Sequence, residues 1–253
     1  MVKYGIDVSR HNGAINWNRV KDSGKVDFVI LRAGYGKLAS QKDERFEEYY
    51  SACKKLGIPV GAYWYSYAKT VMEAEQEARV FLECIKGKNF EYPLYFDIEE
   101  KTAFNQGLFI CSAMAEKFCE TLEKAGYFAG IYASKSHLET YLSAEVRQRF
   151  AVWVAHYGVG QTSYSGQFGM WQKSSTGHID GISGNVDLDE CYQDYPEIIQ
   201  GRGLNGFEKS TPPSDAPADE TVPKKMLEIV VKLDGKIIKS DTVEINVESL
   251  LKS

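Results

Sequence analysis

The chain has 253 residues, of which 43% are hydrophobic and 26% are charged, and its formal net charge is -5. This composition predicts a globular protein with one large core or two small ones, and it excludes the fibrous and wholly disordered classes. The negative charge argues against nucleic acid as a partner, because nucleic-acid affinity rests largely on Lys and Arg side chains that neutralise phosphates.

The chain begins Met1-Val2-Lys3-Tyr4-Gly5 and lacks the apolar stretch of a secretory signal. We therefore expect a protein that is made in the cytoplasm and reaches any extracellular target after release or by another export route. No run approaches the roughly 18 consecutive apolar residues that a membrane span needs, so we predict no membrane insertion.

Short β-rich runs alternate with amphipathic helical stretches over residues 1–200, a pattern typical of a parallel sheet with crossover helices. Helical periodicity is clear in residues 43–56, 71–85 and 108–125. After residue 135 the predicted helices become short and the strands crowd together. We predict an α/β fold, an irregular (β/α) TIM-like barrel with fewer than eight helices. The eight predicted strands are residues 4–7, 28–33, 59–67, 94–99, 128–133, 152–156, 169–172 and 186–188.

Residues 201–225 are rich in Gly and Pro among Ser, Thr, Asp and Glu, which predicts a linker between the barrel and a tail. In the tail, residues 226–253, β-forming residues alternate on both sides of Asp234-Gly235, a strong turn signal. We predict a small β-hairpin, which at this size should pack on the barrel, pair with a second copy, or join an assembly. Self-association through this hairpin is one of these alternatives.

The five cysteines and four histidines are dispersed, without a C-x-x-C pair or the His spacing of a zinc site. We therefore predict no metal site and no cofactor, and we interpret the cysteines as buried thiols.

Residues 92–100 form an apolar strand that ends in acids. Because side chains alternate along a strand, Asp97 and Glu99 should share one face, with Cα atoms about 6.6 Å apart, while Glu100 faces away. Taken alone, such a pair is more often a solvated loop feature than a site. Asp7 and Asp187, however, place acids on two further strands near what we predict are their carboxyl ends, the rim where such barrels assemble active sites.

Four clustered carboxylates repel one another, which raises at least one pKa and keeps a proton available near neutral pH. Without a histidine cluster to suggest a metal, this arrangement favours glycoside hydrolysis.

Aromatic side chains support a sugar-binding interpretation. Alternation places Tyr63, Tyr65 and Tyr67 on one face, directed into the barrel, where their rings could stack on sugars or fill the core. Trp153 and Trp171 carry the same ambiguity. Arg32 ends an apolar strand and needs a charged partner, for which we expect one of the four carboxylates.

Seven motifs in one order resemble the family 25 glycoside hydrolases, the Chalaropsis-type lysozymes or N-acetylmuramidases that include endolysins. The resemblance runs from Tyr4 to about Tyr192. The motifs are G5-I-D-V-S-R-H-N-G13 with I15-N-W17, I30-L-R-A-G34, G61-A-Y63, D97-I-E99, I131-Y-A-S134, W153-V-A-H-Y157, and W171-Q172 with G181-I-S-G-N-V-D-L188.

The resemblance implies hydrolysis of the β-1,4 bond between N-acetylmuramic acid and N-acetylglucosamine in bacterial peptidoglycan, whose glycan strands would be the partner. It implies that Glu99 is the general acid and that Asp97 stabilises the anomeric centre, through the substrate's acetamido group or as a nucleophile. Asp7 and Asp187 match supporting acids. Cleft-lining positions are implied for Tyr63 and Tyr132, and we add Tyr65, Arg32 and Trp153 as candidate substrate-binding residues.

Two positions depart from the family pattern. Trp64 stands where many members have His, and alternation turns it away from the cleft. Asp189 stands where many have Asn, and we interpret it as a capping or surface acid.

Two other functions stay open. One is a catalytically silent glycan-binding module on the same barrel, and the other is a metal-dependent deacetylase, which would need clustered histidines.

Overall fold

The computed structural model describes residues 1–209, 224–233 and 236–246. The chain divides into two compact units, Met1–Ser210 and Thr211–Ser253. The first is a barrel and the second contains a pair of strands, and each is described by itself below.

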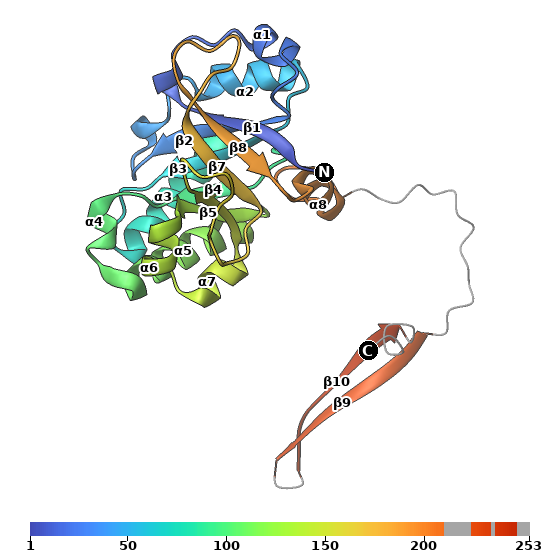
Figure 1. Ribbon diagram of the computed structural model, residues 1–253. Helices are drawn as coiled ribbons and strands as arrows, with labels where there is room; N and C mark the ends of the chain where they lie inside the picture. The colour runs from blue at the N-terminus through green and yellow to red at the C-terminus, as the bar shows by residue number, and fades with distance from the viewer. Residues whose placement is uncertain (210–223, 234–235, 247–253) are drawn as a thin grey trace, which may run out of the picture. The chain divides into compact units, whose positions relative to one another are not determined.

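Eight strands close the barrel in the order β1 to β8 (Figure 1). Neighbouring strands from β1 to β7 are parallel, whereas β8 is antiparallel to both β7 and β1. This confirms the predicted α/β barrel, and each predicted strand overlaps an observed one. The strands are β1 (Lys3–Val8), β2 (Phe28–Tyr35), β3 (Val60–Tyr65), β4 (Leu94–Asp97), β5 (Ala129–Ser134), β6 (Ala151–Ala155), β7 (Met170–Gly177) and β8 (Val186–Cys191).

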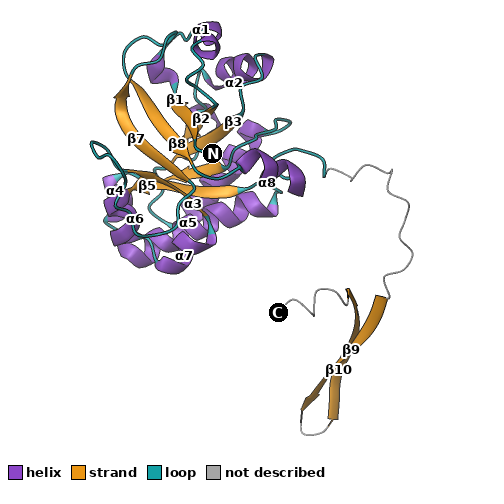
Figure 2. Cartoon of the chain, turned by 45° about the vertical axis from the view of Figure 1, so that its right-hand side comes forward, coloured by secondary structure: helices purple, strands orange, loops and turns teal. Residues whose placement is uncertain are grey.

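The helices are distributed unevenly around the strands (Figure 2). Two α-helices connect β4 to β5 and two connect β5 to β6, but within residues 151–191, all of which the structure describes, none connects β6 to β7 or β7 to β8. The prediction of an irregular barrel is right, but that of fewer than eight helices is wrong, because the described residues contain eight α-helices. Several have only four to seven residues, too few to display a clear apolar period in sequence. They are α1 (Trp17–Asp22), α2 (Phe46–Lys55), α3 (Val71–Ile85), α4 (Lys101–Phe104), α5 (Gly107–Lys124), α6 (Lys135–Tyr141), α7 (Ala144–Arg149) and α8 (Tyr195–Arg202).

Strand alternation produces two apolar layers. Trp64 and Phe96 point outward and pack on Phe81 of α3 and Phe118 of α5, with ring centroids 5.4 and 4.5 Å apart. Tyr95 belongs to the separate cluster inside the barrel. Since Tyr95 points inward and Phe96 outward, the next residue of β4, Asp97, points inward at the strand's carboxyl end. The outward orientation of Trp64 agrees with the prediction.

The barrel continues beyond the predicted boundary at residue 200, which falls inside α8. Gly203 ends this helix in a left-handed conformation with φ 65°. The fully buried Asn205 then donates hydrogen bonds to the carbonyls of Phe90 and Tyr92 and accepts one from the Phe128 amide. Gly203, which falls in the predicted linker, therefore caps a helix. Most of the predicted linker, residues 201–225, lies outside the described residues.

In the second unit, β9 (Lys224–Leu233) and β10 (Lys236–Asn246) form an antiparallel pair, with a register shift between Ile237 and Lys239. The first strand begins two residues before the hairpin predicted for residues 226–253. The predicted turn residues, Asp234 and Gly235, lie outside the described residues, as do residues 247–253. Self-association through the hairpin stays a prediction.

Among the described helices, none combines the length and the apolar character needed to cross a bilayer.

Candidate active site

A cavity of about 450 Å³ lies at the barrel rim where the parallel strands end. The structure brings all nine sequence-predicted site residues to its wall, although they come from seven strands and the segment after β4. They are Asp7, Arg32, Tyr63, Tyr65, Asp97, Glu99, Tyr132, Trp153 and Asp187. The wall also includes residues that were not predicted, namely Ser9, His11, Asn12, Tyr157, Gln172 and Asn185.

Asp187 reaches this rim for a different reason from the one predicted. We expected it near the carboxyl end of a parallel strand, but β8 runs antiparallel and Asp187 is the second residue of the strand. The beginning of an antiparallel strand lies at the rim where its parallel neighbours end. Asp7 of β1 pairs with Asp187 of β8, so the two residues lie side by side at the rim of the barrel.

Asp97 and Glu99 occupy different depths of the cavity. Asp97 is 3% exposed, and its Oδ1 atom has no hydrogen-bond partner among the described residues. Glu99 is exposed, at the solvent side of the cavity. Because β4 ends at Asp97, strand alternation does not govern the residues that follow it. Glu100 does not line the cavity, although Tyr65, a cavity residue, donates a hydrogen bond of 2.8 Å to its Oε1.

Burial and mutual repulsion raise the pKa values of the acids in the cavity. Burial, and then the negative charge of Glu99, raise the pKa of Asp97, while the Arg32 guanidinium acts in the opposite direction. The cavity walls partly desolvate Glu99 even at its open side, and this desolvation, followed by the charges of Glu100 and Asp187, raises the pKa of Glu99. Burial raises the pKa of Asp187 to about 6. These carboxyl groups therefore hold protons at higher pH than free acids do.

Gln172, which follows Trp171 in β7, joins Asp7 to two tyrosines. Its Nε2 donates to Asp7 Oδ2 at 2.6 Å, and its Oε1 accepts hydrogen bonds from Tyr132, at 2.7 Å, and from Tyr157. The amide can do this because it has a donor on one side and an acceptor on the other. Trp171 points away and donates to the carbonyl of His156, so alternation along β7 could have identified Gln172 as inward-facing.

Asp189 is a buried member of the site and not the capping or surface acid that we expected. It is 1% exposed, and its Oδ1 accepts a hydrogen bond of 2.9 Å from the Trp153 indole. Burial raises its pKa, and burial followed by the charge of Asp189 raises that of Asp7. Two buried carboxyl groups in contact favour sharing a proton. The sequence could have predicted that Asp189 faces the site, because it lies two residues after Asp187 and the two side chains therefore share one face of the strand.

The aromatic residues divide between wall and floor. Tyr63 and Tyr65 are partly exposed in the cavity wall, whereas Trp153 is almost fully buried at its floor, with its ring centroid 4.5 Å from that of Tyr132. Tyr67 lies beyond the end of β3 and does not line the cavity, so its predicted inward orientation is wrong. Its ring instead packs against Tyr65 and Tyr35, with centroids 5.2 and 6.0 Å away.

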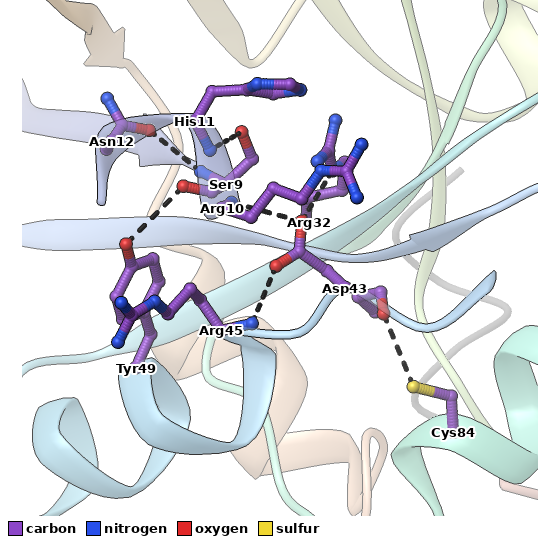
Figure 3. A network of polar contacts seen from close by, with 10 residues as sticks. Ser9, Arg10, His11, Asn12, Arg32, Asp43, Arg45, Tyr49 and Cys84 are labelled. Carbon is purple, nitrogen blue, oxygen red and sulfur yellow. Dashed lines mark hydrogen bonds and ion pairs between the residues drawn. The ribbon is translucent and has the colours of Figure 1, made fainter. Parts of the chain in front are cut away.

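Arg32 pairs with Asp43 and not with one of the four predicted carboxylates. Arg32 Nε lies 2.7 Å from Asp43 Oδ2 in a buried ion pair (Figure 3). Asp43 falls within the segment predicted as a helix, but α2 begins only at Phe46. It lies in a turn whose backbone returns to β2, where the Asp43 amide donates to the Ala33 carbonyl. The sequence around Arg32 does not indicate this partner, because the turn that carries Asp43 meets Arg32 only in the folded chain.

A bulge in β2, just after Arg32, sets the direction of Tyr35. The register with β3 shifts between Arg32 and Gly34, so that Arg32 pairs with Tyr63 and Tyr35 pairs with Tyr65. Ala33 belongs to the outer core and Gly34 lies against the outward-facing Trp64, so both point away from the barrel interior. The extra residue therefore directs Arg32 and Tyr35 toward the same side, which regular alternation would not allow.

A short 3-10 turn after β1 carries further wall residues. Ser9 and Asn12 form a reciprocal capping box around Arg10–Asn12, part of which is visible in Figure 3. Asn12 Nδ2 also donates to the carbonyl of Asn185, which joins the turn to the segment before β8. These contacts place His11 and Asn12 at the cavity edge.

Behind the wall, Glu77 of α3 holds the turn that follows β3. It is 1% exposed, and its carboxylate accepts hydrogen bonds from Ser66 Oγ at 2.6 Å and the Tyr67 amide at 2.9 Å. The Ser66 amide in turn donates to the carbonyl of Asp97. A glutamate inside an amphipathic helix gave no reason to expect this role. Glu77 therefore links α3 to the strand end that carries Asp97.

Within the ranges that the structure describes, no group of three or more His, Cys, Asp and Glu side chains is arranged to hold a metal ion.

Comparisons with known proteins assign the chain to a family. The model of the glycosyl hydrolases family 25 matches residues 6–182. The autolytic lysozyme of Clostridium acetobutylicum is 28% identical over 186 residues, which cover 74% of this chain and 55% of that protein. Lysozyme M1 of Streptomyces globisporus is 29% identical over 197 residues, covering 72% and 65%. The chain thus spans little more than half the length of the first of these relatives.

Solved structures agree with this assignment. The bacterial lysozyme from Streptomyces coelicolor matches with a TM-score of 0.67 and 28% identity, covering 76% of this chain and 92% of that one. The modular autolysin LytC from Streptococcus pneumoniae, in complex with a synthetic peptidoglycan ligand, matches with a TM-score of 0.68 and 32% identity, covering 76% and 47%. With the family model matching well over half of its length, and with acids gathered at one rim of the barrel, this chain belongs to the glycosyl hydrolases of family 25.

Proposed function

We propose that this protein is a lysozyme of the N-acetylmuramidase type, which hydrolyses the β-1,4 bond between N-acetylmuramic acid and N-acetylglucosamine in peptidoglycan. The observation that carries the proposal is the pair of acids at two depths of one cavity, Asp97 buried and Glu99 open to solvent. Family membership and the similarity to lysozymes support the substrate class.

In this proposal Glu99 donates a proton to the glycosidic oxygen. Its position at the open side of the cavity suits contact with a bond in a long glycan, and its raised pKa lets it hold the proton at higher pH than a free glutamic acid does. As the bond breaks, the leaving oxygen takes that proton and positive charge develops at the anomeric carbon.

Asp97 stabilises that charge. As a buried anion it acts more strongly than it would in water, either on the anomeric carbon directly or by orienting the substrate's acetamido group. The Arg32 guanidinium favours the ionised form of Asp97 against its burial and the charge of Glu99. Glu100 and Asp187 supply negative charge that raises the pKa of Glu99, and Asp7 is held in the same cavity by Gln172.

The reducing ends released from purified peptidoglycan test this proposal. N-acetylmuramic acid at the new reducing ends supports it, whereas N-acetylglucosamine ends would make the enzyme a glucosaminidase. Binding to peptidoglycan without any new reducing ends would favour the silent glycan-binding module, and release of acetate would favour a deacetylase. We also propose that the enzyme acts on the cell wall after release or export from the cytoplasm.

A further inference from the structure

We propose that Arg10 and Arg32, both beside the ring of Tyr35, form a carboxylate-binding site at the edge of the catalytic cavity. The proposed ligand is an acidic group that the peptidoglycan strand carries on its muramic acid residues. The identity of the carboxylate rests on the proposed function, whereas the site itself rests on the contacts of these residues.

Arg32 supplies a buried cation whose hydrogen-bonding capacity is only partly used. The residue is 9% exposed, lines the catalytic cavity and pairs through Nε with Asp43. Its Nη2 atom is buried and has no partner among the described residues. A buried guanidinium donor without an acceptor costs free energy, and an acceptor supplied by a ligand would remove that cost.

Arg10 supplies a second cation beside the same aromatic ring. Its guanidinium carbon lies 5.8 Å from the centroid of the Tyr35 ring, and that of Arg32 lies 5.9 Å from it. Arg10 is exposed, and its side chain makes no ion pair within residues 1–209. The tyrosine ring attracts both cations and restricts their positions without neutralising either charge.

Asp43 cannot balance both arginines. Its Oδ2 accepts hydrogen bonds from Arg32 Nε and from the backbone amide of Arg10, and its Oδ1 accepts one from the backbone amide of Arg45 (Figure 3). The carboxylate is therefore occupied by one guanidinium and two amides. Asp43 thus accepts no hydrogen bond from the Arg10 side chain or from Arg32 Nη2, and the charge of Arg32 also acts on Asp97, whereas that of Arg10 is not paired within residues 1–209.

This positive charge lies next to a cavity that is lined by acids. Asp7, Asp97, Glu99 and Asp187 would repel an anionic group on a substrate. A peptidoglycan strand carries such groups, either the lactyl carboxylate of a muramic acid without peptide or the carboxylates of an attached peptide. Arginine is well suited to bind them because its planar guanidinium forms two parallel hydrogen bonds to a carboxylate. The site would thus direct the acidic groups of the strand away from the catalytic acids.

Three soluble glycan oligomers of equal length test the site. The first carries its peptides, the second is peptide-free with free lactyl carboxylates, and the third is peptide-free with those carboxylates converted to neutral methylamides. KM is measured on each for the full chain and for Arg10→Gln, Arg10→Lys and Arg202→Gln. Arg202 is the matched control, because it is an exposed arginine on α8, which supplies no residue to the cavity.

We expect Arg10→Gln to raise KM for an acidic oligomer relative to the neutral one about three- to fivefold, the size typical of an exposed charge pair. Arg10→Lys should keep most of the original ratio, and Arg202→Gln should leave it unchanged. The acidic oligomer that shows the effect identifies the source of the carboxylate. An unchanged ratio in Arg10→Gln, or an equal change in Arg202→Gln, would overturn the proposal.

Calorimetric binding separates a failure of this site from a failure of the proposed function. If the unmodified protein cleaves none of the oligomers, the proposed function fails, and binding of all three oligomers still tests the site. In that case weaker binding to Arg10→Gln of either acidic oligomer, with unchanged binding of the methylamide oligomer, supports the site, and unchanged binding of both acidic oligomers overturns it.

Discussion

At the scale of single residues, the environment of each acid matters more than its place in a motif. Asp97 and Glu99 are two positions apart, yet one is buried and the other faces solvent, because the strand ends between them. Asp189 and Asp187 lie equally close in sequence, and Asp189 is enclosed while Asp187 lines the cavity. These differences in burial place carboxyl groups that are close in sequence in different electrostatic environments.

The first prediction concerns the two acids of the proposed reaction. Glu99→Gln keeps the shape of the side chain but cannot deliver a proton, so we expect about 10²- to 10⁴-fold loss in kcat. Asp97→Asn removes the charge that stabilises the anomeric centre, and a loss at least as large is expected. Both variants should retain the fold, as measured by circular dichroism alongside turnover.

Glu116→Gln is the control for these variants, because it removes an exposed acid from α5, outside the cavity. Glu100→Gln distinguishes the neighbouring acid, which accepts a hydrogen bond from Tyr65. An inactive Glu100→Gln beside an active Glu99→Gln would transfer the role of proton donor to Glu100.

The second prediction concerns Glu77 and pH. Burial raises the pKa of Glu77 from 4.5 to about 7, against hydrogen bonds from Ser66 and Tyr67 that lower it. Between these pH values the folded state holds a proton that the unfolded chain releases, so stability is lost as pH rises from about 4.5 to 7. Glu77→Gln has no such loss and keeps an acceptor for Tyr67 and a donor for Ser66.

Melting temperatures at pH 5 and pH 8 check this. We expect the variant to gain stability relative to the unmodified protein at pH 8, by up to about 3 kcal/mol, and to gain little at pH 5. Glu83→Gln, on an exposed position of the same helix, controls for the change in net charge. Parallel pH profiles for Glu77→Gln and the unmodified protein would contradict the assignment.

At the scale of elements, two irregular strands decide what the site contains. The bulge in β2 directs Arg32 and Tyr35 to one side, and the reversal of β8 brings Asp187 to the rim. A parallel β8 would move Asp187 away from the cavity wall, and a regular β2 would turn Tyr35 away from the side that Arg32 faces.

The third prediction tests the β2 bulge through Gly34. A Cβ atom at this position would lie 2.5 Å from the Trp64 ring and 2.7 Å from the backbone carbonyl oxygen of Gln41. Gly34→Ala should therefore cost about 1–3 kcal/mol in stability, as overpacking does, and should raise KM by displacing Arg32. Chemical denaturation and kinetics measure the two effects.

Gly160→Ala is the matched control, because a Cβ atom at that glycine would meet no heavy atom of the described residues within 4 Å. Equal stabilities of the two variants would show that the bulge tolerates a side chain.

At the scale of the whole molecule, the barrel is a unit that extends to the segment after α8. Asn205 joins the chain end of this unit to the segments before β4 and β5 through three hydrogen bonds between its side-chain amide and backbone groups. The paired strands β9 and β10 form a separate unit.

The fourth prediction follows from this boundary. A chain that ends at residue 209 should fold and cleave a soluble glycan at the full-length rate, because every cavity residue lies within it. A chain that ends at residue 200 should be destabilised by several kcal/mol, since it loses Asn205 and leaves buried backbone groups unpaired. Thermal melting and turnover of both truncations provide the measurement. Loss of turnover in the longer truncation, with its fold intact, would make the tail part of the active unit.

Local patterns in the chain were sufficient to predict the barrel class and the approximate position of every barrel strand, because the apolar periodicity of a strand or a helix is a local property. Together with the family resemblance they predicted nine of the residues that meet in the cavity, since the carboxyl ends of parallel strands share one rim, but they missed six others. The direction of β8, the partner of Arg32 and the burial of Asp189 emerged only in the folded molecule. Each of these depends on which distant segment lies opposite, as when the turn at Asp43 meets Arg32, and no local pattern records that proximity.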